Sequence, residues 1–264
     1  MLAAMAANGK IEVVVLGSGT SHGVPMIGCT CAVCTSDDPR DKRTRPSIVV
    51  RVADEHLLVD TTPELRLQCL ANDVRSIGAV LFTHHHADHV AGLDDLRRFN
   101  WINRRALPCY GTKRTLANLR RMFAYAFEQA PDSPHSRPEL ELIEIDGAPF
   151  DVGRARVVPI PLMHGPLPVL GFRFGNFAYC TDCSEVPPDS RDLLRDLDVL
   201  ILDALRLTPH PTHFNLEQAI DMAGRIGAGK TYFTHVAHEI GHEAINADLP
   251  DGMELAYDGL RIAL

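Results

Sequence analysis

The chain has 264 residues, of which 45% are hydrophobic, 23% charged and 6% aromatic. An apolar fraction of this size supports a full hydrophobic core and excludes an intrinsically disordered protein. The 26 basic and 34 acidic residues leave a net charge of −8, which disfavours a general binder of polyanions. No run approaches the roughly 20 apolar residues of a membrane span, and residues 1–10 lack the pattern of a secretory signal. We therefore expect a cytoplasmic protein that does not engage membranes.

The first half of the sequence predicts strands that lead into polar loops. Residues 11–16 form an apolar, β-branched run, typical of a buried strand, which continues into the glycine-rich segment Gly17-Ser18-Gly19-Thr20-Ser21. An irregular loop is expected from there to about residue 46. Beyond it the pattern predicts strands at 47–53 and 56–60, a helix at 62–70 and a strand at 79–83. The last of these strands ends directly at a cluster of histidines.

The second half repeats this mixture of elements. Helices are predicted at 94–100, 113–127, 216–226 and 242–247. Strands are predicted at 139–145, 155–160, 169–174, 177–180, 199–203 and 231–234, with terminal strands between 253 and 262. Two strand-rich halves with interspersed helices indicate two packed sheets covered on the outside by helices. No low-complexity linker separates the halves, so residues 1–264 are expected to form one domain.

Several metal-binding side chains follow the strand predicted at 79–83, in the segment His84-His85-His86-Ala87-Asp88-His89. His84 and His86 alternate in an extended segment and can face the same way, whereas Asp88 and His89 can serve a second ion. His85 is expected to point away. The alternative is a solvent-exposed histidine-rich loop, which the strand-to-loop context and the partners farther along the chain disfavour.

The order of the later histidines and aspartates resembles the metallo-β-lactamase superfamily, whose signature is His-x-His-x-Asp-His followed by a lone His, a lone Asp and a final His. His164, Asp182 and His235 stand at the three later positions. The resemblance implies an α+β fold, a four-layer αββα sandwich, and a dinuclear metal site. In such a site one ion is bound by His84, His86 and His164, the other by Asp88, His89 and His235, and Asp182 bridges the two.

This ligand set is suited to hydrolysis. Two divalent ions a few ångströms apart can hold a bridging hydroxide at neutral pH and stabilise charge on the group that it attacks. Imidazole and carboxylate ligands suit zinc, manganese or iron, so the sequence does not name the metal.

Three cysteines crowd into the short segment Gly28-Cys29-Thr30-Cys31-Ala32-Val33-Cys34. They are close enough to surround one ion if a fourth ligand arrives from elsewhere, and such crowding does not suit an extracellular disulfide framework. Three free thiols on a loop are the alternative. The other four cysteines are expected to be core or incidental residues: Cys69, Cys109, Cys180 and Cys183.

The glycine-rich loop and the cysteine segment together resemble the branch of the superfamily that contains the cyclic phosphate phosphodiesterases of phosphonate breakdown. In that branch the three cysteines share a structural zinc with a histidine three residues after the last active-site histidine, which is the position of His238. A further histidine, matched by His213, serves the phosphate or the leaving group. The resemblance extends from about residue 11 to residue 262, and the family suggests a homodimer.

The resulting hypothesis is metal-dependent hydrolysis of a small cyclic phosphate diester, with zinc or manganese in the active site. The hydroxide between the ions would attack phosphorus, Asp88 would orient it, and His213 would hydrogen-bond a phosphoryl oxygen or protonate the departing alkoxide. Arg43, Arg45 and Arg206 are candidates for phosphate contacts because a guanidinium matches phosphate geometry, although surface arginines are usually only solvated.

Other functions use the same kinds of residue. An RNA-processing nuclease is one, because eight basic and five aromatic residues interleave without an acidic residue between Leu96 and Ala126. A charged helical face is the preferred interpretation of that stretch, since the total charge is negative. A lactonase or thioesterase would direct the same hydroxide at a carbonyl carbon. The last alternative is a non-catalytic accessory module in cofactor biosynthesis, from a branch with a similar cysteine loop.

Overall fold

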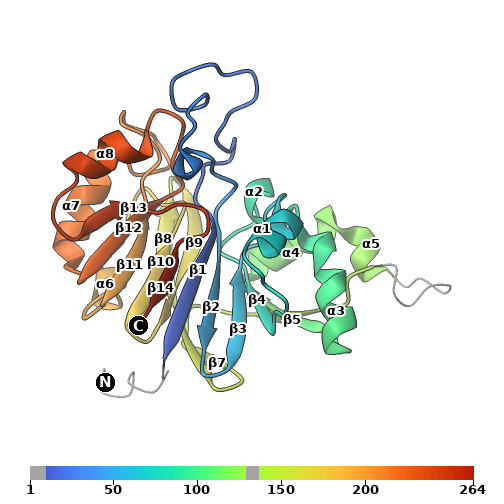
Figure 1. The fold of residues 1–264 in the computed structure, drawn as a ribbon. Helices are drawn as coiled ribbons and strands as arrows, with labels where there is room; N and C mark the ends of the chain where they lie inside the picture. Colours follow the sequence, from blue (N-terminus) through green and yellow to red (C-terminus); the bar gives the residue numbers. More distant parts are fainter. Residues whose placement is uncertain (1–9, 129–136) are drawn as a thin grey trace.

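Two seven-stranded sheets face each other in the computed structural model, which describes residues 10–128 and 137–264 (Figure 1). The first sheet contains, from one edge to the other, β14 (Arg261–Ala263), β1 (Ile11–Gly17), β2 (Ser47–Val52), β3 (Glu55–Val59), β4 (Ala79–Leu81), β5 (Leu107–Gly111) and β6 (Leu140–Glu144). The second contains β13 (Met253–Leu255), β12 (Lys230–Thr234), β11 (Val199–Asp203), β10 (Phe177–Cys180), β9 (Leu167–Phe174), β8 (Ala155–His164) and β7 (Phe150–Val152).

Helices cover the outer faces of both sheets. Five lie beside the first sheet: α1 (Leu65–Ala71), α2 (Ala87–Val90), α3 (Arg97–Asn103), α4 (Lys113–Met122) and α5 (Ala124–Phe127). Three lie beside the second: α6 (Pro188–Asp192), α7 (Leu216–Ile226) and α8 (His242–Asp248). Two short 3-10 helices are η1 (Pro39–Asp41) and η2 (Leu93–Leu96). The αββα sandwich expected from the sequence is confirmed.

The inner faces of the sheets form one shared core. Val13 and Val50 of the first sheet belong to the same buried cluster as Phe172, Tyr179 and Ile201 of the second. Because each sheet is covered on both faces, strands such as β1 and β11 have nearly continuous apolar sequences instead of alternating ones.

The outer faces pack on the helices in two further clusters. Leu16 of β1 packs in a cluster with Leu65 of α1 and Leu119 of α4, and Leu202 of β11 packs in another with Ala219 of α7. Complete burial of one such leucine contributes about 1.5–3 kcal/mol relative to an exposed position. These contacts fix the strands, and therefore the loops that follow them.

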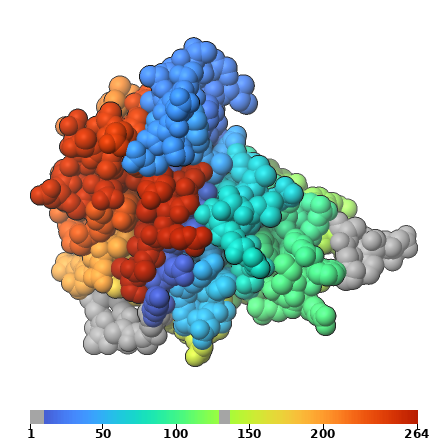
Figure 2. All heavy atoms as spheres, in the orientation of Figure 1, coloured from blue at the N-terminus to red at the C-terminus, as the bar shows by residue number. Residues whose placement is uncertain are grey.

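Strand direction brings the loops that hold the histidines and aspartates to one end of the sandwich. Strands β10, β11 and β12 are parallel, so their carboxyl ends meet at a single edge of the second sheet. The long loop at residues 18–46, blue in Figures 1 and 2, lies against the C-terminal part of the chain. In this contact Asp41 accepts a hydrogen bond of 2.8 Å from the backbone nitrogen of His242.

Several predicted boundaries are wrong. The helix predicted at 113–127 is two helices, because Phe123 leaves the helical conformation with φ −118° and ψ 42°. Strand β8 continues to His164, beyond the predicted end at residue 160, since Pro159 and Pro161 weaken the strand pattern there. The short elements β5, β7 and α6 were not predicted. Within the two described ranges, no helix is long and apolar enough to cross a bilayer.

Candidate metal centre

The predicted metal ligands lie at the ends of strands from both sheets. His84 follows β4, and His164 is the last residue of β8. Asp182 follows β10, and His235 comes directly after β12. All four side chains are buried, with exposed fractions between 1% and 7%. The fold therefore gathers residues that are up to 151 positions apart in the sequence into one place.

The structure brings these residues together as two groups of metal-ligating atoms. His84, His86 and His164 form the first group, and the second consists of Asp88, His89, Asp182 and His235. Within each group, the ligand atoms lie within 4.8 Å of one another. These are the two sets that the sequence predicts.

Asp182 lies between the groups. Its Oδ1 is 3.1 Å from Nε2 of His89 and 3.3 Å from Nε2 of His235, both in the second group. Its other oxygen, Oδ2, is 3.9 Å from Nε2 of His84 in the first group. One carboxylate thus presents an oxygen to each side, which is the arrangement of a bridging ligand.

The donor atoms fit divalent metal ions. The Nε2 atoms of His84, His89 and His235 are buried and have no hydrogen-bond partner among the described residues. Leaving buried polar atoms unpaired is costly, and coordination of a cation would satisfy all three. Imidazole nitrogen and carboxylate oxygen together suit zinc or manganese.

Hydrogen bonds on the far side of the rings orient the histidines. Nδ1 of His164 lies 2.7 Å from the carbonyl oxygen of Thr212, to which it donates. The hydroxyl of Thr83 donates its proton to the carboxylate of Asp60. Nδ1 of His84, which lies 3.0 Å from the same Oγ1, therefore donates to it. Because the protons are on Nδ1, each Nε2 keeps a lone pair for a metal ion.

Asp60 supports the second ligand group, and no sequence pattern predicted it. Its Oδ2 lies 2.7 Å from Nδ1 of His89, and its Oδ1 accepts a hydrogen bond of 2.9 Å from the backbone nitrogen of Thr83. Burial raises the pKa of the Asp60 carboxyl. In the sequence, Asp60 is a lone aspartate at the end of a predicted strand. Such aspartates are too common for one of them to be predicted as part of a metal site.

Backbone strain marks the same site. Asp60, Asp182 and His235 adopt left-handed conformations, with φ of 64°, 52° and 63°. Such residues cost about 1–3 kcal/mol each unless the surrounding structure compensates. Their concentration around the two ligand groups indicates that the backbone is bent there to aim the side chains.

His213 lies beside both groups. Its ring centroid is 4.5 Å from that of His164 and 4.7 Å from that of His235. Its Nδ1 is 3.2 Å from Oδ1 of Asp203, another residue that the sequence analysis missed. Burial by itself disfavours the imidazolium, but the Asp203 carboxylate raises the pKa of His213 to about 9. The ring is therefore held by one nitrogen and placed to donate a proton from the other.

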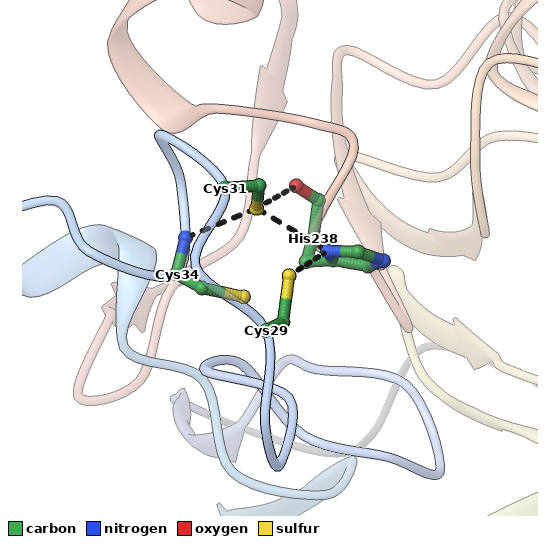
Figure 3. Close-up of side chains that lie close together, drawn as sticks. All are labelled: Cys29, Cys31, Cys34 and His238. Carbon is green, nitrogen blue, oxygen red and sulfur yellow. Dashed lines mark hydrogen bonds between the residues drawn. The ribbon is translucent and has the colours of Figure 1, made fainter.

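The side chains of Cys29, Cys31 and Cys34 lie close to that of His238 (Figure 3). The sulfur atoms of Cys29 and Cys31 each lie 3.3 Å from Nδ1 of His238, and the four ligand atoms, with that of Cys34, lie within 4.8 Å of one another. The backbone nitrogen of Cys34 and the ring of His238 lower the pKa of Cys31 to about 6, which favours the thiolate that binds metals. The donor set fits zinc and links the first loop to the loop after β12.

The remaining predicted residues are distributed as follows. His85 belongs to neither ligand group, as predicted. Arg43 is buried and donates to Ser18 and to the carbonyl oxygen of Ala256, so it is excluded as a phosphate contact. Arg45 forms an ion pair with Glu64, whereas Arg206 lines a cavity beside His213.

The basic residues between 97 and 121 lie on α3, on α4 and in the segment that follows α3. Trp101 is 62% exposed, and the guanidinium of Arg98 lies 4.5 Å from the centre of its ring. A hollow of about 600 Å³ next to it is lined by Trp101, Arg104 and Arg105 among others. This surface does not include the metal ligands.

Known proteins resemble the chain over almost its whole length. The sequence model of a protein family, described as the β-lactamase superfamily domain, matches residues 55–236. A crystal structure described as a new diphosphatase from the PhnP family is 41% identical, covers 97% of each chain and superposes with a TM-score of 0.91.

Two curated relatives extend this comparison. An octanoyltransferase of Porphyromonas gingivalis is 39% identical over 94% of this chain, and the chain spans 50% of the length of that relative. A ribonuclease Z of Mycobacterium sp. strain KMS is 28% identical, over 80% of this chain and 84% of the relative.

Proposed function

We propose that the chain, which belongs to the metallo-β-lactamase superfamily, is a metal-dependent hydrolase of small phosphodiesters, with a cyclic phosphate diester as the first candidate. The observation that carries this proposal is the place of Asp182 between two ligand groups, with His213 beside both. A phosphodiester needs both a nucleophile and a proton donor for the leaving oxygen, and these two features supply their positions.

Seven residues would hold two ions, zinc or manganese. Three histidines face the first position, Asp88, His89 and His235 face the second, and Asp182 would bridge them. Divalent ions at such a site lower the pKa of water and offset negative charge on a phosphoryl group. A third ion, a structural zinc, would be held by the cysteines and His238.

The chain's own residues would do the remaining work. The Oδ2 atom of Asp88 lies 3.4 Å from Nε2 of His89 and 3.7 Å from Nε2 of His235, so its carboxylate can accept a hydrogen bond from the attacking water and orient it. His213, held by Asp203, would donate a proton to the departing oxygen. His213 is buried, whereas Asp88 is only partly buried.

A diphosphate is the second candidate substrate. It is supported by the relative described as a diphosphatase, which is 41% identical to this chain over nearly the full length of both. In such a substrate the same attack on phosphorus would expel a phosphate in place of an alcohol. Short RNA is a third possibility, for which the ribonuclease Z relative and the basic surface of α3 and α4 provide weaker support.

A substrate panel tests the proposal. Zinc-loaded and manganese-loaded protein would be given nucleoside cyclic phosphates, a nucleoside diphosphate sugar, an aryl phosphodiester, short RNA and a lactone. We expect turnover of the cyclic phosphates, lost in Asp88→Asn and kept in the control variant Asp221→Asn, since Asp221 is an exposed residue of α7. Activity confined to RNA or to the lactone would contradict the proposal, as would no activity with the metal sites filled.

A further inference from the structure

A cavity of about 220 Å³ opens beside His213, on the side facing the cysteine site. Its lining includes His22, Arg206, His210, His213 and His238. It is smaller than the roughly 300–1,000 Å³ of a site for a complete drug-sized ligand. The cavity therefore suits one part of a substrate whose reacting phosphorus lies at the metal centre.

Arg206 gives this cavity a fixed positive charge. Its Nε donates to the carbonyl oxygen of Thr208 at 3.2 Å, and its Nη2 donates to that of Pro209 at 2.8 Å. Both acceptors are neutral, and no carboxylate in the described ranges lies within ion-pair distance of the guanidinium. The side chain is thus held in place by its own loop and forms no ion pair with a described residue.

His210 adds a hydrogen-bond donor. The backbone nitrogen of Thr212 donates to its Nδ1 at 3.3 Å. A neutral ring whose Nδ1 accepts must carry its proton on Nε2. The centroid of this ring lies 5.2 Å from that of His213, so the donor lies next to the residue assigned to the leaving oxygen.

From this geometry we propose that the cavity binds the leaving group of the substrate, that this group carries a phosphate, and that Arg206 and His210 recognise that phosphate. The inference rests on the proposed function, because His213 marks the side on which the leaving group departs. Glu239, the one carboxylate among the lining residues, is exposed to solvent and weakens the positive field of the cavity. A phosphorylated leaving group, or the phosphate of a diphosphate linkage, fits this lining better than a neutral alcohol does.

Two substrates that share the attacked phosphoryl group test the inference. Uridine diphosphate glucose releases a phosphate monoester, whereas the p-nitrophenyl ester of uridine monophosphate releases p-nitrophenol, which carries no phosphate. The measured quantity is the ratio of kcat/KM for the first substrate to kcat/KM for the second. We expect Arg206→Met to lower this ratio about tenfold or more, Glu239→Gln to raise it, and the surface control Arg225→Met to leave it unchanged.

Binding of glucose 1-phosphate, measured calorimetrically with protein of known metal content, separates this inference from the proposed function. If wild type hydrolyses neither these two substrates nor the cyclic phosphates, but Arg206→Met still weakens binding about tenfold, the phosphate subsite stands and the proposed function fails. If both substrates are hydrolysed, and Arg206→Met changes neither the ratio nor the binding, the subsite is overturned while the proposed function stands.

Discussion

Asp203 lies directly behind His213: its Oδ1 is 3.2 Å from Nδ1 of the histidine. The same oxygen accepts a hydrogen bond of 3.1 Å from the backbone nitrogen of Asp182, and Oδ2 accepts one of 3.2 Å from that of Phe214. The carboxylate of Asp203 therefore fixes the ring of His213 relative to Asp182, which lies between the two ligand groups.

Asp203→Asn should shift the pH dependence of catalysis. Burial opposes the imidazolium of His213, and the charge of Asp203 contributes most, ahead of Asp182 and Asp88, to raising its pKa to about 9. Without that charge the pKa of His213 falls, so the ring loses its proton at a lower pH than in wild type. The basic limb of the kcat profile should then move to lower pH, and kcat at pH 8 should fall about tenfold or more. An unchanged profile, at unchanged metal content, would show that Asp203 does not act through His213.

Asp60→Asn should weaken metal binding. Asp60 accepts the proton of Nδ1 of His89, which fixes the ring and strengthens Nε2 as a ligand. Loss of such a partner typically costs about 10- to 100-fold in metal affinity. Competition with a chelator would measure the change, with Asp221→Asn, an exposed residue of α7, as the control. Wild-type affinity in Asp60→Asn would contradict the orienting role.

Cys31→Ser should remove one zinc ion per chain and lower the melting temperature. The cysteine site connects the first loop to the loop that carries both His235 and His238. Since metal binding contributes to folding free energy, we expect a drop of about 5 °C or more. Cys69→Ser is the control for zinc content, because Cys69 is a buried residue of α1 and does not belong to the group of ligand atoms around His238. The same zinc content in Cys31→Ser and wild type would contradict the site.

Protonation of His242 should make the folded protein less stable in acid. Burial, then the charges of Arg43 and Arg40, lower the pKa of His242 to about 4, compared with about 6.5 in an unfolded chain. The unfolded chain therefore binds the proton more tightly, and stability is lost as the pH falls from about 6.5 to about 4. Urea unfolding at pH 7 and pH 5 should show a larger loss for wild type than for His242→Gln. Equal losses would exclude this residue as a source.

The candidate metal ligands could be predicted because they occur in the order of a known family signature and lie near predicted strand ends. An apolar run predicts a strand, and the side chains just beyond it are confined to one edge of a sheet. His84 was predicted on that basis, whereas His164 and His235 were identified because their order resembles the superfamily signature. The structure places all three at the same end of the sandwich.

The supporting residues could not be predicted in the same way. Asp60 and Asp203 act through contacts with residues 29 and 10 positions away, and a lone aspartate after a strand carries no pattern of its own. The same limit applies to Arg43, whose burial depends on Ala256 and His242 from the far end of the chain. Strand β8 was underestimated because its prolines conceal a strand that pairing with β9 stabilises.

The most direct test of the central claim is the rate of phosphodiester hydrolysis as metal-free protein is titrated with zinc or manganese. Activity should appear only as ions bind beyond the one held by the cysteine site, and Asp182→Asn should abolish it while leaving that cysteine-bound zinc in place. Full activity in metal-free protein would contradict a reaction that depends on the ions held by Asp182. A wild-type rate in Asp182→Asn would contradict it as well.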